Sequence, residues 1–294
     1  MFDTPVLFLI FNRPAPTRQV FEQIRKIQPR YLFVAADGPR KGKPDEVELC
    51  KQTRDIIKEI DWDCELKTFF RDENAGCARN VSGAISWFFE HVNQGIILED
   101  DCLPDITFFS FCEKLLTLYQ DDDKVRAISG FNCQLGIPRS TASYFFASIP
   151  LVWGWATWKD AWMKFEFNID KADSNVFNTP SKKLWQKEIE STFQGKIDSW
   201  DFRWIYSFFK NNYICIYPNV SLVRNVGVGD SATHTFGERW WYKFIKYGQI
   251  RQIKHPAHIE VNEAADELTS RLHMSVKISW ADRIKRIFYK FFGL

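Results

Sequence analysis

Three adjacent carboxylates, Glu99, Asp100 and Asp101, directly follow the apolar run at residues 95–98. Three neighbouring negative charges repel one another, which is costly unless a cation lies among them. Mg²⁺ and Mn²⁺ prefer oxygen ligands and accept one or two protein carboxylates, leaving the other positions to water and substrate phosphates. The triplet therefore predicts a divalent-metal site. The alternative is a solvated acidic turn, the reading we adopt for the aspartates at 121–123.

The elements that would position this triplet alternate between two periodicities. Short apolar runs predict buried strands, and amphipathic stretches predict helices between them. The runs lie at residues 5–11, 31–36, 65–70, 95–98 and 125–129, and the amphipathic stretches at 17–27 and 80–91. This order predicts an α/β fold with a mostly parallel sheet flanked by helices, whose ligands bind at the carboxyl ends of the strands.

Polar residues follow the other strands at that same edge. Arg13 comes after the first predicted strand, Asp37 after the second, and Arg71 and Asn74 after the third. Each could simply form part of a turn, because Asp and Asn favour turns by hydrogen bonding to nearby backbone groups. Their common position at the sheet edge favours one shared site.

Composition limits the classes of function. The chain has 294 residues, of which 45% are hydrophobic, so it can bury a sizeable core. Lys and Arg number 39 against 37 Asp and Glu, which is too balanced for a broad nucleic-acid-binding face. The seven cysteines are scattered without a Cys-x-x-Cys pair, and no basic export signal precedes the first apolar run. We expect a cytoplasmic protein with reduced thiols.

The chain divides into one predicted domain and a tail. Residues 1–135 form the regular βα half and residues 136–262 an irregular, Trp-rich half. The tail at 263–294 ends in a basic segment in which Trp280, Ile284, Ile287 and Phe291 recur at helical spacing. Such an amphipathic helix suits peripheral anchoring at an anionic membrane, and packing on the core or on a subunit is the alternative.

The triplet in this setting resembles the metal-dependent nucleotide-sugar glycosyltransferases of the GT-A (Rossmann-like) fold. The chain looks most like the inverting N-acetylglucosaminyltransferase-like group and bacterial enzymes of cell-surface glycan synthesis. The likeness covers most of residues 5–235 as an order of motifs, and only the triplet is quite specific. It implies a UDP-sugar donor, Mn²⁺ or Mg²⁺, and a glycan or lipid-linked glycan acceptor.

The resemblance also implies roles on the donor side. Asp101 would contact the metal, Asp100 the ribose, and Glu99 would support them from behind. Arg13 and Asp37 match positions that grip the nucleotide base. The loop with Arg71 and Asn74 would lie near the ribose and diphosphate, and so form part of the nucleotide-sugar site.

On the acceptor side, Asp201 matches the region of the family's general base, which takes the proton from the acceptor hydroxyl. Its alternative role is that of a helix N-cap. His234 would complete the metal shell, or be a structural loop histidine. Trp153 and Trp155 resemble the acceptor loop, where indole faces stack on sugars; core packing is the alternative.

These expectations describe a transferase in bacterial polysaccharide synthesis that inverts the anomeric carbon with Asp201 as base. Two other classes stay open. A nucleotidyltransferase could use the same acidic strand end, although Asn12-Arg13-Pro14 is a poor substitute for its Gly-rich basic loop. A non-catalytic carbohydrate-binding or membrane scaffold would explain the aromatic residues and the tail, but not the triplet.

Overall fold

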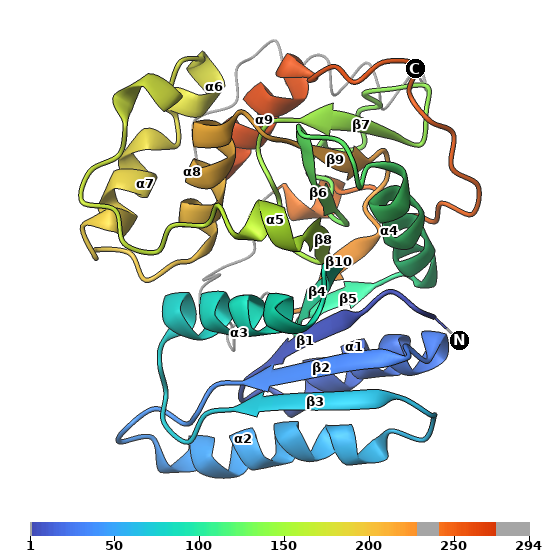
Figure 1. Cartoon of the computed structure of the whole chain (residues 1–294), viewed down its shortest axis with the longest axis vertical. Coiled ribbons are helices and arrows are strands. Elements are labelled where there is room, and N and C mark those ends of the chain that lie inside the picture. The colour runs from blue at the N-terminus through green and yellow to red at the C-terminus, as the bar shows by residue number, and fades with distance from the viewer. Residues whose placement is uncertain (1, 228–240, 275–294) are drawn as a thin grey trace.

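The computed structural model describes residues 2–227 and 241–274, and its centre is a mixed eight-stranded sheet (Figure 1). The strand order is β3-β2-β1-β4-β8-β6-β9-β7, and β5 pairs with β10 in a separate two-stranded ribbon. The strands are β1 (Val6–Ile10), β2 (Tyr31–Ala36), β3 (Glu65–Phe70), β4 (Gln94–Glu99), β5 (Cys102–Pro104), β6 (Val125–Ser129), β7 (Tyr144–Ala147), β8 (Trp155–Trp158), β9 (Ile214–Pro218) and β10 (Val223–Asn225).

The α-helices connect these strands and cover both faces of the sheet. They are α1 (Pro14–Ile27), α2 (Pro44–Asp55), α3 (Cys77–His91), α4 (Ile106–Leu118), α5 (Lys159–Trp162), α6 (Pro180–Lys183), α7 (Gln186–Phe193), α8 (Asp201–Asn211) and α9 (Glu263–His273). The predicted α/β class with a mainly parallel sheet flanked by helices is confirmed, as are the five predicted strands and the helices at 17–27 and 80–91.

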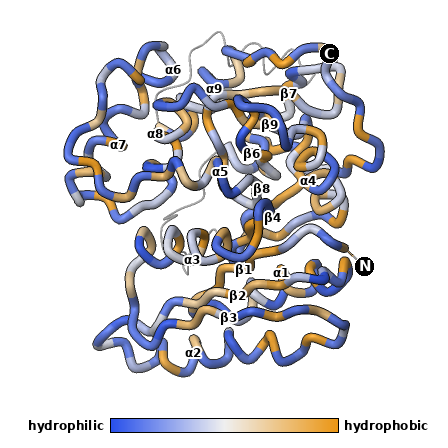
Figure 2. Tube along the Cα trace, in the orientation of Figure 1, coloured by the Kyte–Doolittle hydropathy of each residue, from blue (hydrophilic) through white to orange (hydrophobic). Residues whose placement is uncertain are grey.

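Alternate residues of β1 serve two separate cores because successive side chains of a strand point to opposite faces. Val6 and Phe8 pack with α1 and α4 on one face, whereas Leu7 and Leu9 pack with α3 and α8 on the other. Figure 2 shows hydrophobic segments along the strands in the middle and largely hydrophilic outer loops. A strand buried on both faces has to read as a continuous apolar run, which is how β1 reads.

The Trp-rich segment enters the sheet, contrary to its irregular appearance in the sequence. Residues of β8 pair antiparallel with both β4 and β6. Gly154 turns the chain into this strand with φ of +63°, and a Cβ there would lie 2.7 Å from Val223 Cγ2. Trp155 is consequently a core residue with 1% of its surface exposed, packed among the rings of Trp162, Trp200 and Trp204.

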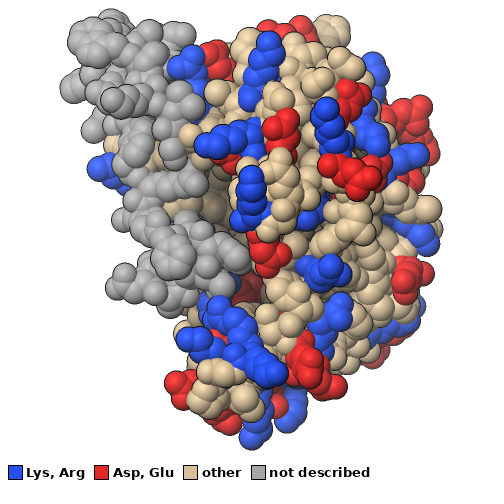
Figure 3. Space-filling view, turned by 90° about the vertical axis from the view of Figure 1, so that its left-hand side faces the viewer, with Lys and Arg blue, Asp and Glu red and all other residues tan. Residues whose placement is uncertain are grey.

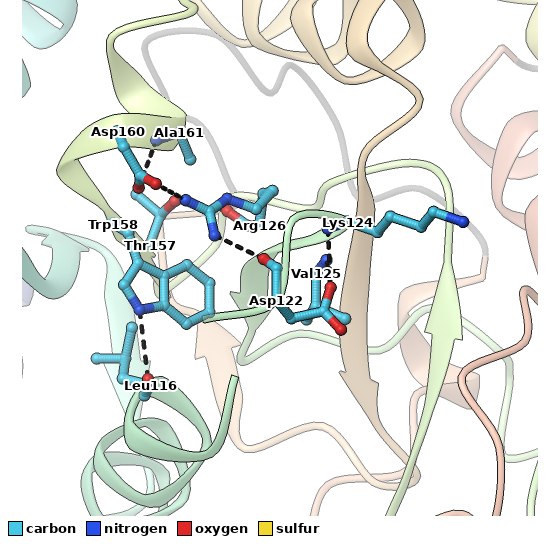
Figure 4. A network of polar contacts seen from close by, with 9 residues as sticks. All are labelled: Leu116, Asp122, Lys124, Val125, Arg126, Thr157, Trp158, Asp160 and Ala161. Atoms are coloured by element: carbon cyan, nitrogen blue, oxygen red, sulfur yellow. Dashed lines mark hydrogen bonds and ion pairs between the residues drawn. The ribbon is translucent and has the colours of Figure 1, made fainter. Parts of the chain in front are cut away.

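A buried guanidinium fixes β6 to β8 and α5 (Figure 4). Arg126 forms an ion pair with Asp160 and donates a hydrogen bond of 2.7 Å to the carbonyl of Asp122. Thr157 Oγ1 donates to the Arg126 carbonyl at 2.6 Å, and the guanidinium lies over the Trp158 ring at 5.3 Å. A buried cation needs such partners, so this network holds the antiparallel strand in register.

Helix α9, which lies in the segment predicted as the tail, packs against the core of the described residues. Ala265 and Leu268 lie in the hydrophobic core. Gln134 Nε2 donates to the Thr269 hydroxyl at 2.9 Å, and Trp185 Nε1 donates to Ser270 Oγ at 2.8 Å. The basic amphipathic segment of the tail lies outside the described residues. Within the described ranges, every helix is too short or too polar to span a bilayer.

The buried carboxyl of Asp266 gives the fold a pH signature. Burial raises its pKa to about 6, and hydrogen bonds from Ser148 and the charge of Lys182 offset only part of that rise. Because its folded pKa lies above the usual value of 3.8, the folded state binds more protons between these pH values. This group therefore lowers stability as pH increases from about 4 to about 6, by up to about 3 kcal/mol.

We expect Asp266→Asn to remove that pH dependence. Asparagine keeps an acceptor for Ser148 N and gains a donor for its hydroxyl. In urea unfolding, the variant should gain stability relative to wild type as pH rises from 4 to 6, and the difference should be flat above pH 7. A difference that did not change between pH 4 and pH 7 would contradict this assignment.

Candidate active site

A cavity of about 740 Å³ lies where the carboxyl ends of β1, β2 and β4 meet the second half of the chain. Most of the predicted site residues line it, namely Arg13, Asp37, Asn74, Glu99, Asp100, Asp101, Trp153 and Asp201. These residues come from positions between 13 and 201 of the chain. The parallel strands bring the first six together at one edge, as the order of strands and polar ends predicts.

Arg13 is the cation that the acidic triplet requires. Its guanidinium forms an ion pair with Asp100, and its Nη1 lies 3.0 Å from Asp101 Oδ2. Asp100 Oδ2 also accepts a hydrogen bond of 3.2 Å from the backbone N–H of Phe11. Arg13 begins α1 immediately before Pro14, so the strand-to-helix turn fixes the guanidinium beside the end of β4.

The three carboxylates still carry more negative charge than Arg13 offsets. Burial and the neighbouring charges of Asp101 and Asp100 raise the pKa of Glu99. Burial also raises the pKa of Asp100, although Arg13 opposes that shift. Burial by itself would lower the pKa of Arg13, but the two aspartates raise it above its usual value. The raised pKa values of Glu99 and Asp100 show that negative charge is unfavourable where these groups are crowded together, so a further cation would favour their charged forms.

The described residues fit a metal that is shared with a substrate, and do not form a complete protein cage. No group of three His, Cys, Asp or Glu side chains within residues 2–227 and 241–274 has metal-ligand geometry. Asp101 offers one carboxylate to the cavity, with its side chain 15% exposed. Mg²⁺ and Mn²⁺ commonly bind one protein carboxylate together with substrate phosphates. His234, the other predicted ligand, lies outside the described residues.

The backbone of Val226 and Gly227, which we call the strap, lies over the ion pair formed by Arg13 and Asp101. The N–H of Val226 donates to the Asp101 carbonyl at 2.8 Å, which continues the pairing of β10 with β5. Gly227 follows, and a Cβ there would overlap the Asp101 carboxylate and lie 2.7 Å from Arg13 Nη1. Only glycine permits so close an approach. The nitrogen Nε of Arg13 is buried beneath this cover and has no acceptor among the described residues.

Asp37 organises the neighbouring part of the cavity. Its Oδ1 accepts hydrogen bonds of 2.9 Å from the backbone N–H groups of Gly38 and Ala75, and its Oδ2 accepts one of 2.9 Å from Asn74 Nδ2. Burial raises the pKa of Asp37 despite the backbone hydrogen bonds that favour its charged form. Oδ2 retains one lone pair for a donor on a ligand.

Arg71 does not line the cavity, in contrast to Asn74 from the same loop. Its guanidinium lies over the Phe69 ring at 4.8 Å, and its Nε donates to Asn80 Oδ1 at 3.2 Å. Asn80 in turn lines the cavity. The contacts of Arg71 are therefore those of a residue that supports the wall behind the site.

Asp201 faces the triplet from the other half of the chain. It is the first residue of α8, and its Oδ1 accepts hydrogen bonds from Ser199 Oγ and from the N–H of Phe202. Nearby, Asp198 crosses to the first half and accepts from the N–H groups of Cys77 and Ala78, at 3.1 and 3.2 Å, at the start of α3. Asp198 therefore caps α3. In α8, the N-cap position considered for Asp201 is occupied by Trp200, and Asp201 lies in the first turn.

The two tryptophans expected on the acceptor side have different environments. Trp153 is partly exposed and lines the cavity. Trp155 is buried in the core and does not line it, because β8 turns its side chain into the layer between the sheet and α8. Core packing, the alternative for these rings, is therefore correct for Trp155.

Several lining residues carried no recognisable signal in the sequence. Arg40, Asp198, Trp185, Tyr242 and His273 belong to loops or to helices of the second half. His273 stands at the end of α9, and its ring packs against Trp185 and Trp241 with centroid distances of 5.6 and 5.7 Å. Long-range packing brings these residues together, and no local spacing in the sequence predicts that they meet.

Comparison with known proteins leaves the family open. No family model matches the chain, and no curated protein matches it. Mouse xyloside xylosyltransferase 1, without ligand, aligns with 88% of this chain and 100% of its own, at 10% identity and a TM-score of 0.38. A UDP-glucose pyrophosphorylase, also without ligand, aligns with 72% of this chain and 90% of its own, at 8% identity and a TM-score of 0.38.

A cytidylyltransferase from Leptospira borgpetersenii aligns with 56% of this chain and 64% of its own, at 11% identity and a TM-score of 0.36. The names of these three structures describe enzymes that act on nucleotides or sugars. At such TM-scores and identities the likeness carries no argument about activity. The site's own chemistry has to supply that argument.

We expect Arg13→Gln to lower the free energy of unfolding by about 3 kcal/mol, because it leaves two largely buried carboxylates without their cation. Arg18→Gln is the matched control, since Arg18 forms an exposed ion pair with Glu59 and its loss should cost less than about 1 kcal/mol. Urea unfolding at pH 7 measures both variants. Equal losses would show that Arg13 does not stabilise the carboxylates in this way.

Proposed function

We propose that this protein is a GT-A glycosyltransferase that moves a sugar from a UDP-sugar to a glycan or lipid-linked glycan in bacterial cell-surface polysaccharide synthesis. One observation carries the proposal. A single cavity holds an acidic cluster at the carboxyl ends of parallel strands, and a separate carboxylate, Asp201, stands on the opposite half. Transfer between two large substrates needs such a pair of sites, one to hold the leaving diphosphate and one to activate the acceptor.

On the donor side, the nucleotide lies along the ends of β1, β2 and β4. Asp37 Oδ2 accepts a hydrogen bond from the ring N–H of uracil, while Asn74 and the backbone of Gly38 keep the carboxylate oriented. Asp100 reaches the ribose. Arg13, expected from the resemblance to grip the base, has contacts that suit another role here: it holds Asp100 and Asp101 in place.

Asp101 and His234 are the protein ligands that we propose would hold the metal, Mn²⁺ or Mg²⁺. When bound, the metal would offset the negative charge of the departing diphosphate. The surplus of carboxylates over guanidinium groups at this edge supports a cation at Asp101. Glu99 stands behind Asp100 and Asp101, where burial and these two aspartates raise its pKa and so favour its protonated form until a cation binds.

On the acceptor side, Asp201 takes the proton of the acceptor hydroxyl. The hydroxyl oxygen forms a bond to the anomeric carbon while the bond from that carbon to the phosphate oxygen breaks, and UDP leaves with the bonding electron pair. The hydrogen bonds from Ser199 Oγ and Phe202 N orient the Asp201 carboxylate. Attack opposite the leaving group inverts the anomeric configuration.

A nucleotidyltransferase is the alternative reaction for this cavity, because it needs the same acidic strand end. The turn from β1 to α1 consists of Phe11, Asn12 and Arg13 and lacks the glycines that would cradle a triphosphate. Release of pyrophosphate from UTP and a sugar phosphate, without release of UDP from UDP-sugars, would favour this alternative.

We expect UDP to raise the melting temperature of the protein only when Mn²⁺ is present, because a ligand that binds only the folded state stabilises it by mass action. Asp101→Asn should abolish the shift without unfolding the protein. Asp121→Asn, in the other acidic run, is the matched control and should keep it. An unchanged shift in Asp101→Asn would remove Asp101 from the metal site.

Asp201→Asn should lower the rate of sugar transfer by about 10²- to 10⁴-fold, the usual contribution of a general base, while the UDP-dependent rise in melting temperature stays as in wild type. UDP release from a panel of UDP-sugars, with a mixture of bacterial glycans as acceptors, measures the rate. Asp170→Asn, an exposed carboxylate outside the cavity, is the control. Wild-type turnover in Asp201→Asn would exclude this residue as the base.

A further inference from the structure

The half of the cavity around Asp201 differs in chemistry from the donor half. We call it the aromatic half; its described lining comes from residues 131, 150–153, 185, 197–202, 205, 241–242 and 273–274. Partly exposed rings of Trp153, Phe202 and Tyr242 lie here beside buried ones. An exposed ring inside a cavity offers an apolar face to whatever enters.

Neighbouring rings hold Trp153 in place. Its indole lies 4.6 Å from the centroid of Phe131 and 5.6 Å from that of Tyr242, and Trp241 packs against both of these partners. The adjoining backbone is fixed as well, because Gly154 accepts a hydrogen bond of 2.7 Å from the N–H of Gly130. A ring that is already ordered loses little conformational entropy when a ligand stacks on it.

The charges of the cavity are strongly one-sided. Among the described lining residues, six carboxylates stand against two guanidinium groups. Both guanidinium groups, Arg13 and Arg40, belong to the donor half and already pair with carboxylates. The described lining of the aromatic half contains Asp198 and Asp201 but no Lys or Arg, and its one histidine, His273, packs between indoles.

The face visible in the side view of Figure 3 does not share this imbalance. Acidic and basic side chains are interspersed over it. Charges of the two signs offset one another there, whereas carboxylates outnumber guanidinium groups among the described residues of the cavity. Low-dielectric walls strengthen the field of such an excess.

We propose that the acceptor segment bound in the aromatic half is an uncharged sugar ring stacked on Trp153, and that Asp198 and Asp201 exclude acceptors bearing a carboxylate or phosphate there. The inference rests on the proposed function and adds the class of acceptor. The C–H face of a neutral pyranose suits an indole, and its hydroxyl groups can donate to the carboxylates. An anionic sugar would approach two negative charges. The guanidinium that interacts with both, that of Arg203, is buried behind the wall and donates to backbone carbonyls there, so the site discriminates by repulsion.

Direct binding tests the inference without turnover. Saturation-transfer NMR on the full chain compares methyl β-glucopyranoside with its uronate, methyl β-glucopyranosiduronate, at low ionic strength and at about 0.3 M salt, where charges are screened beyond a few ångströms. We expect the uronate to bind about five- to tenfold more weakly at low ionic strength, and the difference to shrink in salt. Asp198→Asn should reduce the discrimination, and Asp170→Asn should not.

Two variants of Trp153 test the stacking. Trp153→Ala should weaken binding of the neutral glycoside about five- to tenfold, and Trp153→Phe should keep most of it, since a ring face remains. Equal binding of the uronate and the neutral glycoside, or wild-type binding by Trp153→Ala, would overturn the inference. So would the absence of any glycoside signal.

The UDP-dependent melting shift, measured on the same samples, separates this result from the proposed donor site. A selective glycoside signal without any UDP shift would contradict the proposed glycosyltransferase and leave the neutral-sugar site standing. A UDP shift with no glycoside selectivity would support the proposed donor site and overturn the neutral-sugar site.

Discussion

The arrangement of the site depends on negative charge that is concentrated at one edge of the sheet. Strand β4 ends at three adjacent carboxylates, of which Asp100 is buried and Glu99 and Asp101 are partly buried. Such a cluster is stable only with cations nearby. Arg13 provides one from the start of α1, and the strap that ends at Gly227 closes over the pair. The remaining excess of negative charge is the physical reason to expect a cationic ligand.

Both halves of the chain line the cavity, and direct contacts hold them together. Asp198 from the second half holds the first turn of α3, while β8 from the second half pairs directly with β4. Arg126 in turn fixes β8 to β6 and α5 (Figure 4). Because these contacts span the interface, the distance between the acidic edge and Asp201 depends on the packing of the whole unit and not on one flexible loop.

Under the proposed function, one negatively charged cavity would bind two substrates with different charge requirements. A diphosphate donor would bring negative charge and need a cation, which the donor half could share through Asp101. The acceptor would bind beside Asp201 without adding a further charge. The aromatic half is lined by aromatic rings and two carboxylates, and no Lys or Arg is among its described lining residues. This lining favours a neutral acceptor.

The sequence by itself determined the regular half of this protein. Apolar runs with the period of buried strands, alternating with amphipathic helices, were sufficient for the α/β class. The parallel arrangement then required the polar residues at the strand ends to meet. Arg13, Asp37, Asn74 and Asp100 lie together for this reason. The motif at β4 was visible because its three carboxylates directly follow an apolar run, whereas the aspartates at 121–123 do not.

Only the tertiary structure decided the second half. Trp153 and Trp155 are two residues apart in one Trp-rich segment, yet one lines the cavity and the other lies in the core, because β8 inserts antiparallel between β4 and β6. Asp198, Tyr242 and His273 reach the cavity through contacts between segments far apart in the chain. Local periodicity records which face of an element is buried, whereas long-range packing decides what that face meets.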